Sequence, residues 1–512
     1  MKSLSQLRRD AKALRKAHEA SDPVALQRLK VHPPRPDEVP LKHADYLHVI
    51  AIESGFASWP ALKEAQEMLG LDRAAKLQRL KIALAHGQNA RVDRLLADTP
   101  DLAYGLFGLQ VALLNRNTVE QMLAEDPGLA TRVVAHQSPM CFLAFSKRLQ
   151  AEPERQEDMI AIAELLLAHG ADVNDGRPVS PDSDHRLSVL YGAIGHADNM
   201  VLGRWLLDHG ADPNDGESLY HATELGHHEG LRMLLEAGAD PRGTNALLRA
   251  MDFNDHQAVR MLLAHGAEPD DFNDTVIGDE QPWVVPALHQ AARRMSDAEM
   301  IALLLEAGAD PARTYQGCSA YGHARVFGNA ALAWAIEARG AEPELTPEER
   351  VLAMAADGDV PSGTRVDTEK LPEAYRTIVR QILHLPGKLD HVKRLVAIGV
   401  DHDGSDTEGL TPVQVAGWEG LPDVMAYLLS LRPDLSHVNG YGGTLLSTIL
   451  HGAENCPDRA ERDYIACLRL ALEQGVALPR AAIEFANDDR IAEFLAGWAE
   501  DHPGAVVDHG AF

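Results

Sequence analysis

The sequence is poor in positive charge. Its 512 residues include 48 Lys and Arg against 76 Asp and Glu, which gives a formal net charge of −28 at pH 7, and no Lys occurs between Lys147 and Lys370. A protein that neutralises nucleic-acid phosphates or anionic lipid headgroups needs clustered basic residues. The composition therefore argues against nucleic acid and against a membrane surface as partners.

Cysteine, aromatic residues and long apolar runs are also scarce. The cysteines are scattered without a CxxC spacing, so we expect reduced thiols and no cysteine-based metal site. No apolar run reaches the roughly 18 to 20 residues of a membrane span, and the basic N-terminus lacks the apolar stretch of a secretory signal. These absences predict a cytoplasmic protein. Aromatic residues are only 5% of a chain that is 45% hydrophobic, so the core must be mostly Ala and Leu.

The chain does contain a ten-residue sequence motif, called the repeated phrase below, that recurs at the ends of amphipathic helix patterns. It reads LLLAHGADVN from Leu165, WLLDHGADPN from Trp205, MLLEAGADPR from Met233, MLLAHGAEPD from Met261 and LLLEAGADPA from Leu303. Each copy predicts the last turn of a helix, a Gly in the left-handed conformation that stops it, and a following turn. In two degenerate earlier copies, Thr99 and Asp126 occupy the Gly position.

The best-preserved unit starts at Asp406 and reads DTEGLTPVQVAGWEGLPDVMAYLLSLRPD. It contains Gly-x-Thr-Pro, an apolar first helix, a turn at Gly420 and a second helix. This unit resembles the ankyrin repeat, whose T-P-L-H-x-A signature stands here as Thr411 to Ala416, with Gln414 in place of the usual His. A closer His occurs in ALHQAA from Ala287.

The resemblance covers about residues 75 to 500, and the spacing from Gly399 to Arg432 is the 33 residues of an ankyrin period. The string GFASWPALK near the start is similar to the leader of bacterial ankyrin-repeat proteins. In this string Gly55 can stop one helix, and Ser58 and Pro60 can begin the next. The resemblance therefore implies an ankyrin-repeat protein of bacterial type.

The implied fold class is all-α, an ankyrin-repeat solenoid of stacked helix pairs with short or irregular hairpin loops. A single helix pair cannot bury its apolar face, so neighbouring units share one elongated core. We expect a helical N-terminal cap over residues 1–74, an ankyrin array over 75–343, a second array over 344–505 after an irregular junction, and a tail over 506–512.

The units differ in length. The two units between Gly210 and Gly266 are 28 residues each, about five fewer than the ankyrin period, so they should lack full β-hairpins between units. Longer intervals hold Pro- and Asp-rich insertions near 175–186 and 270–286, which we interpret as surface loops. The 59-residue interval that follows Gly340 is the largest irregularity and marks the junction.

Histidine is the residue type that suggests chemistry. The densest cluster, YHATELGHHEG, holds His221, His227, His228 and Glu229, which could be imagined as metal ligands. They straddle a turn and lack the HExxH spacing, so we interpret them as structural groups at the turn that joins two helices. Three further histidines precede a helix-stopping Gly and are expected to cap helix ends: His169, His209 and His265.

The sequence predicts no catalytic residues, no metal ligands and no cofactor. It contains neither a GxxxxGK[ST] phosphate loop nor a GxSxG nucleophile elbow. Paired carboxylates are abundant, but in so acidic a chain they are expected as solvated surface groups.

The remaining candidates are surface residues. By analogy with ankyrin repeats, the two residues before the turn within each unit project into a concave groove. Counting back from each helix stop gives ten candidate binding residues: Glu224, Leu225, Asp252, Phe253, Arg294, Met295, Val326, Phe327, Trp418 and Glu419. Aromatic residues and Arg dominate the energetics of binding surfaces. For Phe253, Phe327 and Trp418 a second interpretation stays open, in which they fill core space.

Two functions follow from this sequence. The favoured one is a non-enzymatic protein–protein interaction scaffold that binds a partner protein or peptide in the concave groove, and the acidic charge favours a partner with a basic patch. The alternative is an enzyme, or a small-molecule or metal-binding sensor, with a pocket at the irregular central repeats.

Overall fold

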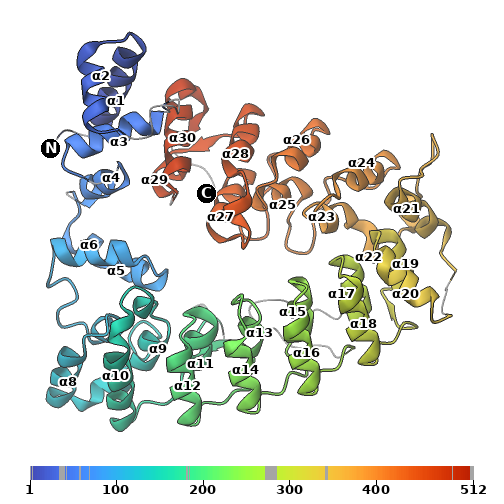
Figure 1. Ribbon diagram of the computed structural model, residues 1–512, viewed down its shortest axis with the longest axis horizontal. Helices are drawn as coiled ribbons and strands as arrows, with labels where there is room; N and C mark the ends of the chain where they lie inside the picture. Colours follow the sequence, from blue (N-terminus) through green and yellow to red (C-terminus); the bar gives the residue numbers. More distant parts are fainter. Residues whose placement is uncertain are drawn as a thin grey trace. The chain divides into compact units, whose positions relative to one another are not determined.

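The computed structural model describes residues 2, 4–33, 41, 43–56, 59–68, 70–179, 183, 185–270, 285–340, 344–486 and 488–507 (Figure 1). The chain forms two compact units, Met1–Asp172 and Val173–Phe512. The expected boundaries, after residues 74 and 343, differ from this division. In the second unit one apolar core holds Phe327 before residue 343 and Leu352 after it, so helices on both sides of the junction bury the same core.

The first unit begins with four helices: α1 (Leu4–Glu19), α2 (Pro23–Val31), α3 (His43–Glu53) and α4 (Trp59–Met68). Asp22 caps α2, because its carboxylate accepts hydrogen bonds from the amides of Val24 and Ala25. These helices share an apolar cluster of their own that includes Trp59. Gly55 has a left-handed φ of 89°, as expected of a helix stop, whereas Ser58 lies outside the described residues. A capping role for residues 1–74 stays a prediction.

Three helix pairs complete the first unit. They are α5 (Arg73–Ala85) with α6 (Asn89–Asp98), α7 (Phe107–Ala112) with α8 (Arg116–Glu125), and α9 (Pro139–Ala144) with α10 (Gln156–Ala168). Thr99 and Asp126 end α6 and α8 with φ values of −137° and −141°, not in the left-handed region. The degenerate copies of the phrase therefore stop their helices in a different backbone conformation.

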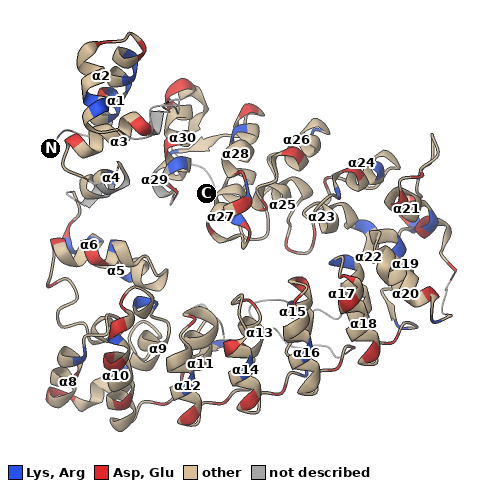
Figure 2. Ribbon diagram, viewed as in Figure 1, with Lys and Arg blue, Asp and Glu red and all other residues tan. Residues whose placement is uncertain are grey.

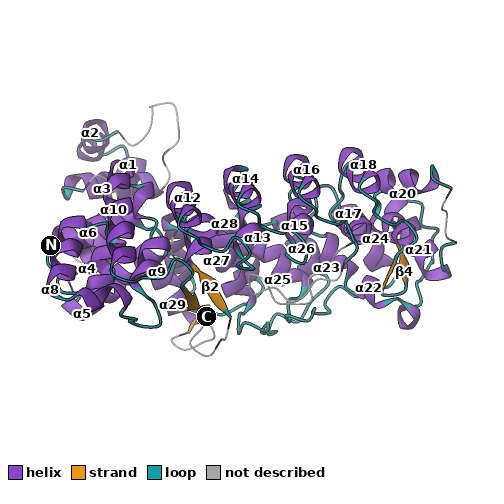
Figure 3. Ribbon diagram, turned by 90° about the horizontal axis from the view of Figure 1, so that it is seen from below, coloured by secondary structure: helices purple, strands orange, loops and turns teal. Residues whose placement is uncertain are grey.

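The second unit opens with the regular helix pairs. They are α11 (Val189–Tyr191) with α12 (Met200–Asp208), α13 (Ser218–Ala222) with α14 (Glu229–Glu236), α15 (Ala246–Asp252) with α16 (His256–Ala264), α17 (Ala287–Arg293) with α18 (Ala298–Glu306), and α19 (Ala320–Phe327) with α20 (Ala330–Glu337). A π-helical turn, Gly192–His196, follows α11. First helices stack on first helices and second helices on second helices, so α13, α15, α17 and α19 form one row and α12, α14, α16, α18 and α20 another (Figures 1 and 3).

The repeated phrase acts as expected at the end of the second helices. Gly210 and Gly238 have φ values of 91° and 95°, a conformation that other residues rarely adopt. A Cβ at either position would meet no atom within 4 Å, so the requirement for Gly is conformational and not steric.

The remaining helices of the second unit follow α20. They are α21 (Pro347–Asp357), α22 (Glu373–Arg376), α23 (Ile378–Ile382), α24 (Leu389–Ala397), α25 (Pro412–Trp418), α26 (Pro422–Ser430), α27 (Leu445–Asn455), α28 (Tyr464–Glu473), α29 (Arg480–Phe485) and α30 (Asp489–Asp501). The Thr346 hydroxyl and the Glu349 carboxylate form a reciprocal capping box at the start of α21. Thr411 and Gln414 form the same motif at the start of α25.

Strands are short and few in the described part of the second unit. Antiparallel pairs join β1 (Gly176–Pro178) to β2 (Arg186–Ser188) and β3 (Thr314–Tyr315) to β4 (Cys318–Ser319), and a parallel pair joins β5 (Leu478–Pro479) to β6 (Val506–Val507). The two 28-residue units between Gly210 and Gly266, which are described throughout, contain no strand. Most of the insertion at 270–286 and the last five residues of the tail lie outside the described residues.

The all-α class and the stacked helix pairs are therefore confirmed in each unit. Within the described ranges no helix has both the length and the apolar character that crossing a bilayer requires.

Candidate functional site

The first helices of three consecutive repeats carry a group of charged side chains. We name this group the central inner face and define it by Glu224, Arg249, Asp252, Phe253, Gln290, Arg293 and Arg294, which lie on α15 and α17 or just after α13, α15 and α17. Helix α15 contacts both α13 and α17, so side chains of neighbouring repeats can meet. Lys and Arg are blue in Figure 2, and blue ribbon occurs at α17.

Arg249 links two repeats. Its Nε donates to Glu224 Oε1 at 2.7 Å, and its Nη1 donates to Asp252 Oδ2 at 3.1 Å. Asp252 also accepts from Gln290 Nε2 at 2.6 Å and from Arg294 Nη2 at 3.3 Å, which extends the network to the next repeat. The Nε atom of Arg294 lies 2.8 Å from Asp252 Oδ1. A continuous series of ionic contacts therefore runs from Glu224 to Arg294 across three repeats.

The series continues from Glu224 to buried groups around α13. His221 Nδ1 lies 2.8 Å from Glu224 Oε2, and His221 Nε2 lies 3.3 Å from Glu217 Oε2. The Glu217 side chain is fully buried, and its Oε1 lies 2.6 Å from His185 Nε2. Buried carboxylates need such partners, because an uncompensated charge inside a protein is costly.

The carboxylates set the protonation state of His221. Burial lowers its pKa, but the hydrogen bonds to Glu217 and Glu224 outweigh this effect and raise the pKa to about 9. For Glu224 burial has the opposite effect and raises the pKa. The contacts with His221 and Arg249 outweigh burial and hold this pKa below its ordinary value. Both side chains are therefore charged at neutral pH.

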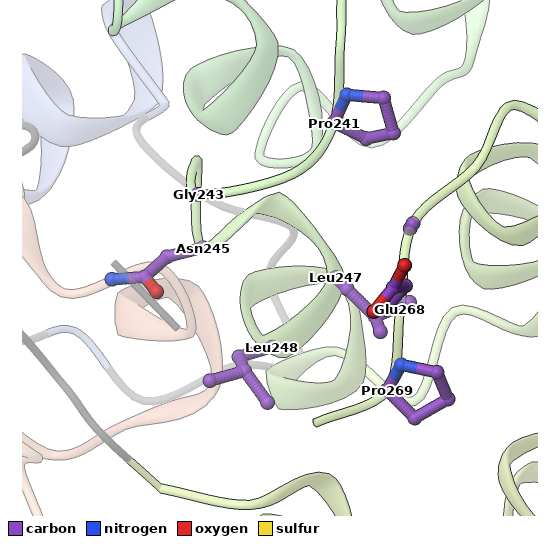
Figure 4. A pocket seen from close by; sticks show the side chains of 8 residues that line it. Pro241, Gly243, Asn245, Leu247, Leu248, Glu268 and Pro269 are labelled. Atoms are coloured by element: carbon purple, nitrogen blue, oxygen red, sulfur yellow. The ribbon is translucent and has the colours of Figure 1, made fainter. Parts of the chain in front are cut away.

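A cavity of about 230 Å³ opens beside this network. Its lining residues come from several elements: Tyr220, Asn245, Leu248, Arg249, Asp252, Val285, Gln290, Arg293, Arg294 and Glu408. A second cavity, shown in Figure 4, lies at the turns around Pro241 and Pro269 and shares Asn245 and Leu248 with the first. Its volume of about 20 Å³ leaves room for about one water molecule, so it holds no ligand of useful size.

Four of the ten predicted binding residues lie on the central inner face. Glu224, Asp252 and Arg294 belong to the ionic network described above. The Phe253 side chain is 44% exposed, and the Arg249 guanidinium carbon lies 5.0 Å from its ring centroid, within the range of a cation–π contact. Leu225 and Met295 are half-buried beside the face.

The prediction that Val326 and Phe327 face the concave groove is wrong. Both are completely buried and belong to the apolar core of the second unit. The Phe327 ring stacks on His323, with ring centroids 5.5 Å apart, and lies 6.4 Å from the Tyr375 ring. The irregular segment after residue 343 supplies Tyr375 to this core, so these two positions face protein and not a partner.

Trp418 and Glu419 are half-buried by the following repeat. The Tyr464 hydroxyl donates to the Trp418 carbonyl at 3.0 Å, and the His451 ring centroid lies 5.0 Å from that of Trp418. Burial raises the pKa of Glu419, whose Oε2 lies 3.8 Å from Arg462 Nη2. A binding role for these two residues stays a prediction.

Counting back from the helix stops missed three residues of the central inner face: Arg249, Gln290 and Arg293. The positions one helical turn before the predicted ones hold His221, Arg249 and Gln290, and residues three or four apart share one helix face. Extending the count by one turn would have found the side chains that connect the repeats.

The histidine cluster does not converge on one point. His221 contacts the two glutamates described above, His227 Nε2 lies 2.9 Å from Asp198, and His228 Nε2 lies 2.7 Å from Asp255. The rings expected to cap helix ends each contact the carbonyl four residues earlier: His169, His209 and His265, at 2.8, 2.7 and 2.8 Å. Among the described residues, no group of three or more His, Cys, Asp or Glu is arranged to hold a metal ion.

A second polar cluster lies in the core near the junction. The Tyr375 hydroxyl donates to Glu349 Oε1 at 3.0 Å and lies 3.2 Å from His323 Nδ1, while His289 Nε2 contacts the Cys318 carbonyl at 3.1 Å. All five residues are buried. Burial raises the pKa of the Cys318 thiol to about 11, so it stays protonated at neutral pH and is a poor nucleophile.

Comparison with known proteins identifies the repeats. The family described as "Ankyrin repeats (3 copies)" matches residues 190–274, and "Ankyrin repeat" matches residues 286–314. The human and mouse proteins named "Protein phosphatase 1 regulatory subunit 27" are each 41% identical over 58 residues, which are 11% of this chain and 38% of the relative. The similarity thus spans well under half the length of these curated relatives.

Similar solved structures are ankyrin repeat domains. That of human ASB11 has a TM-score of 0.32 at 22% identity and covers 42% of this chain and 90% of that domain. A domain from Acinetobacter baumannii has a TM-score of 0.31 at 23% identity, with 40% and 98% covered. The domain of Bcl-3 has a TM-score of 0.22 at 19% identity, with 45% and 92% covered.

The matched residues include α12 to α16 and then α17 and α18, the helices that build and support the central inner face. The helix pairs, their stacking and the left-handed Gly stops agree with these matches. The chain therefore contains ankyrin repeats over residues 190–274 and 286–314.

Proposed function

We propose that this protein is a non-enzymatic protein–protein interaction scaffold that binds a partner protein or peptide on the central inner face. Repeat proteins of this kind use the surface formed by successive repeats for binding. The observation that carries the proposal is the ionic series from Glu224 to Arg294, which connects three repeats on one face. Side chains held in such a network lose little conformational freedom when a partner binds.

Phe253 is the residue best suited to anchor a partner. It is the only phenylalanine among the exposed large apolar side chains of the described residues, and it stands beside Arg249 on this face. Aromatic residues and Arg are enriched among the residues that dominate binding energy. An exposed ring next to an oriented guanidinium offers a partner both an apolar and a charged contact.

The curated relatives support a protein as the partner. They are named as regulatory subunits of protein phosphatase 1, and the similarity to them is confined to 58 residues. We also propose, from the net charge of −28, that the partner carries a basic patch, so that association weakens as salt rises. A cytoplasmic location and a bacterial origin stay predictions.

A small-molecule sensor is the second candidate function. The cavity of about 230 Å³ between the central repeats and Glu408 is the observation that favours it. Metal analysis of the purified protein and a thermal-shift screen against metabolite classes test this alternative. A stabilising metabolite would favour it, and no stabilisation by any class would count against it.

Capture of a partner from the source cells tests the scaffold proposal. We compare the wild-type protein with Phe253→Ala and with the matched control Trp334→Ala, whose ring is 71% exposed on the second-helix row. Loss of an anchor residue costs roughly 2 kcal/mol or more, or about 30-fold in affinity. We expect Phe253→Ala to lose the partner and Trp334→Ala to keep it.

Circular dichroism and thermal unfolding must show that both variants fold like the wild type. Equal capture by all three proteins would contradict binding at the central inner face. Salt dependence of the capture tests the basic patch separately, since an affinity that does not change with salt would contradict only that part.

A further inference from the structure

Three titratable residues lie along one face of α13. Glu217 immediately precedes the helix, His221 lies four residues later, and Glu224 follows three residues after that. Residues three or four apart share one side of a helix, so this face runs from the start of α13 to the central inner face. Exposure changes along it, because the Glu217 side chain is fully buried whereas that of Glu224 is 27% exposed.

His221 contacts these carboxylates with both of its ring nitrogens. Its Nε2 lies 3.3 Å from Glu217 Oε2, and its Nδ1 lies 2.8 Å from Glu224 Oε2. A neutral imidazole carries one N–H and a protonated imidazole carries two, so only the protonated ring can donate to both carboxylates. Burial lowers the pKa of His221, but the two carboxylates raise it to about 9, so the ring keeps its proton at neutral pH.

Neighbouring elements surround the His221 ring. The ring centroids of Tyr191, in α11, and of Tyr220 lie 4.8 Å and 5.0 Å from that of His221. Helices α11 and α15 both contact α13 (Figure 1). The titratable and charged groups that face His221 directly, or face one of its two carboxylates, are Glu217, Glu224, Tyr191, Tyr220, His185 and Arg249. Tyrosine and arginine ordinarily ionise near pH 10 or above, so histidine is the residue type in this group that titrates near neutral pH.

Glu224 connects His221 to the exposed part of the face. Its Oε1 accepts from Arg249 Nε at 2.7 Å, and the Arg249 guanidinium carbon lies 5.0 Å from the Phe253 ring centroid. Hydrogen bonds that involve ionised groups are roughly twice as strong as neutral ones, so Glu224 is held most firmly while His221 is protonated. The orientation of Arg249 beside Phe253 is therefore coupled to the state of a buried ring.

We infer that Glu217 is a positioning residue for partner binding, which orients the central inner face by holding His221 against Glu224. The inference rests on the proposed function, because it assigns Glu217 a role in binding at the face where Phe253 lies. Glu217 is fully buried, so it acts through His221 and does not touch a partner. A buried carboxylate is costly, and an apolar side chain at such a position often serves stability as well or better, so packing alone does not account for this residue.

The first measurement is the pKa of His221 in the full-length protein. Glu217→Gln removes the buried charge and nearly keeps the volume of the side chain. Loss of one opposite charge at this distance lowers a pKa by roughly 1 to 3, which brings that of His221 from about 9 to roughly 6–8. NMR of the protein with labelled histidine follows the ring, and His221→Asn identifies its signal. An unchanged pKa of His221 in Glu217→Gln would overturn the inference.

The second measurement is partner capture at two pH values. The probe is the protein that the wild type captures from source-cell lysate and Phe253→Ala does not. At about pH 6 His221 is protonated in the wild type and in Glu217→Gln, whereas at about pH 8 it is protonated mainly in the wild type. Capture by Glu217→Gln relative to the wild type should therefore fall several-fold between these two values. A purely structural defect would lower this ratio equally at both.

Two further variants assign the effect. In Glu217→Gln combined with His221→Asn the ratio should no longer change with pH, which separates His221 from His185. Glu349→Gln is the matched control, because it removes another buried carboxylate of the second unit, and its ratio should be the same at both pH values. A ratio for Glu217→Gln that does not change with pH overturns the inference and leaves the scaffold proposal standing. If Phe253→Ala captures every protein that the wild type does, the scaffold proposal fails and the inference fails with it.

Discussion

The network on the central inner face predicts that the free energy of unfolding depends on pH. The pKa of His221 is about 9 in the folded protein against an ordinary value of 6.5. At 1.36 kcal/mol for each pKa unit, protonated His221 contributes about 3 kcal/mol to the free energy of unfolding. Because the folded protein binds this proton more tightly, the contribution is complete below about pH 6.5. It is lost as the pH rises through about 9.

Urea denaturation of the wild type and of His221→Asn at about pH 6 and about pH 10 measures this contribution. Other groups titrate over the same range, but they titrate in both proteins, so the difference between them isolates His221. We expect the wild type to be about 3 kcal/mol more stable than the variant at the lower pH, with most of this advantage gone at the higher pH. His265→Asn is the matched control, because the exposed His265 ring contacts the Met261 carbonyl at the end of its own helix. A stability difference between wild type and His221→Asn that does not change with pH would refute the argument.

Three further predictions concern stability and use the urea midpoint as the measurement. Phe327→Ala should cost about 3–5 kcal/mol because the ring is completely buried, and a loss below about 1 kcal/mol would mean that the residue faces a partner after all. Tyr375→Phe should cost about 1–3 kcal/mol, since the buried Glu349 carboxylate loses a donor, and a neutral change would contradict that hydrogen bond. Gly210→Ala should destabilise by about 1 kcal/mol at its φ of 91°, whereas Gly497→Ala in α30, with no atom within 4 Å of the added Cβ, should stabilise slightly. Effects of the same sign at both glycines would refute the conformational explanation.

The features that could be predicted from the sequence are local ones. The repeated phrase predicted the helix ends because a left-handed Gly and the turn after it depend on a few neighbouring residues, as Gly210 and Gly238 show. The start of α21 is local in the same sense, since its capping box lies within four residues. The lack of a β-hairpin in the two 28-residue units could be predicted from the length of these units alone.

The burial of Val326 and Phe327 could not be predicted in this way. Their positions within the repeat match those of Glu224 and Leu225, which reach the inner face or lie beside it. What differs is the segment that follows, because Tyr375 and its neighbours come from the irregular stretch after residue 343 and pack on these side chains. No repeated phrase marks that stretch, so nothing in the local pattern indicated that it would cover α19.

The inner-face network was predicted in part. Counting from the helix stops found Glu224, Asp252 and Arg294 as separate positions. The contacts that join them depend on Arg249 and Gln290 reaching residues 25 and 38 positions away in the chain. Such pairings are set by the stacking of repeats, which determines which turns of neighbouring helices lie at the same height.

Site-specific photo-crosslinking in the source cells tests the central claim most directly. The crosslinker p-benzoylphenylalanine replaces Phe253 on the central inner face, or Trp334 on the second-helix row, at positions where both natural rings are exposed. We predict one discrete crosslinked partner protein from position 253 and none from position 334. A partner crosslinked only from position 334, or equally from both, would contradict binding at the central inner face.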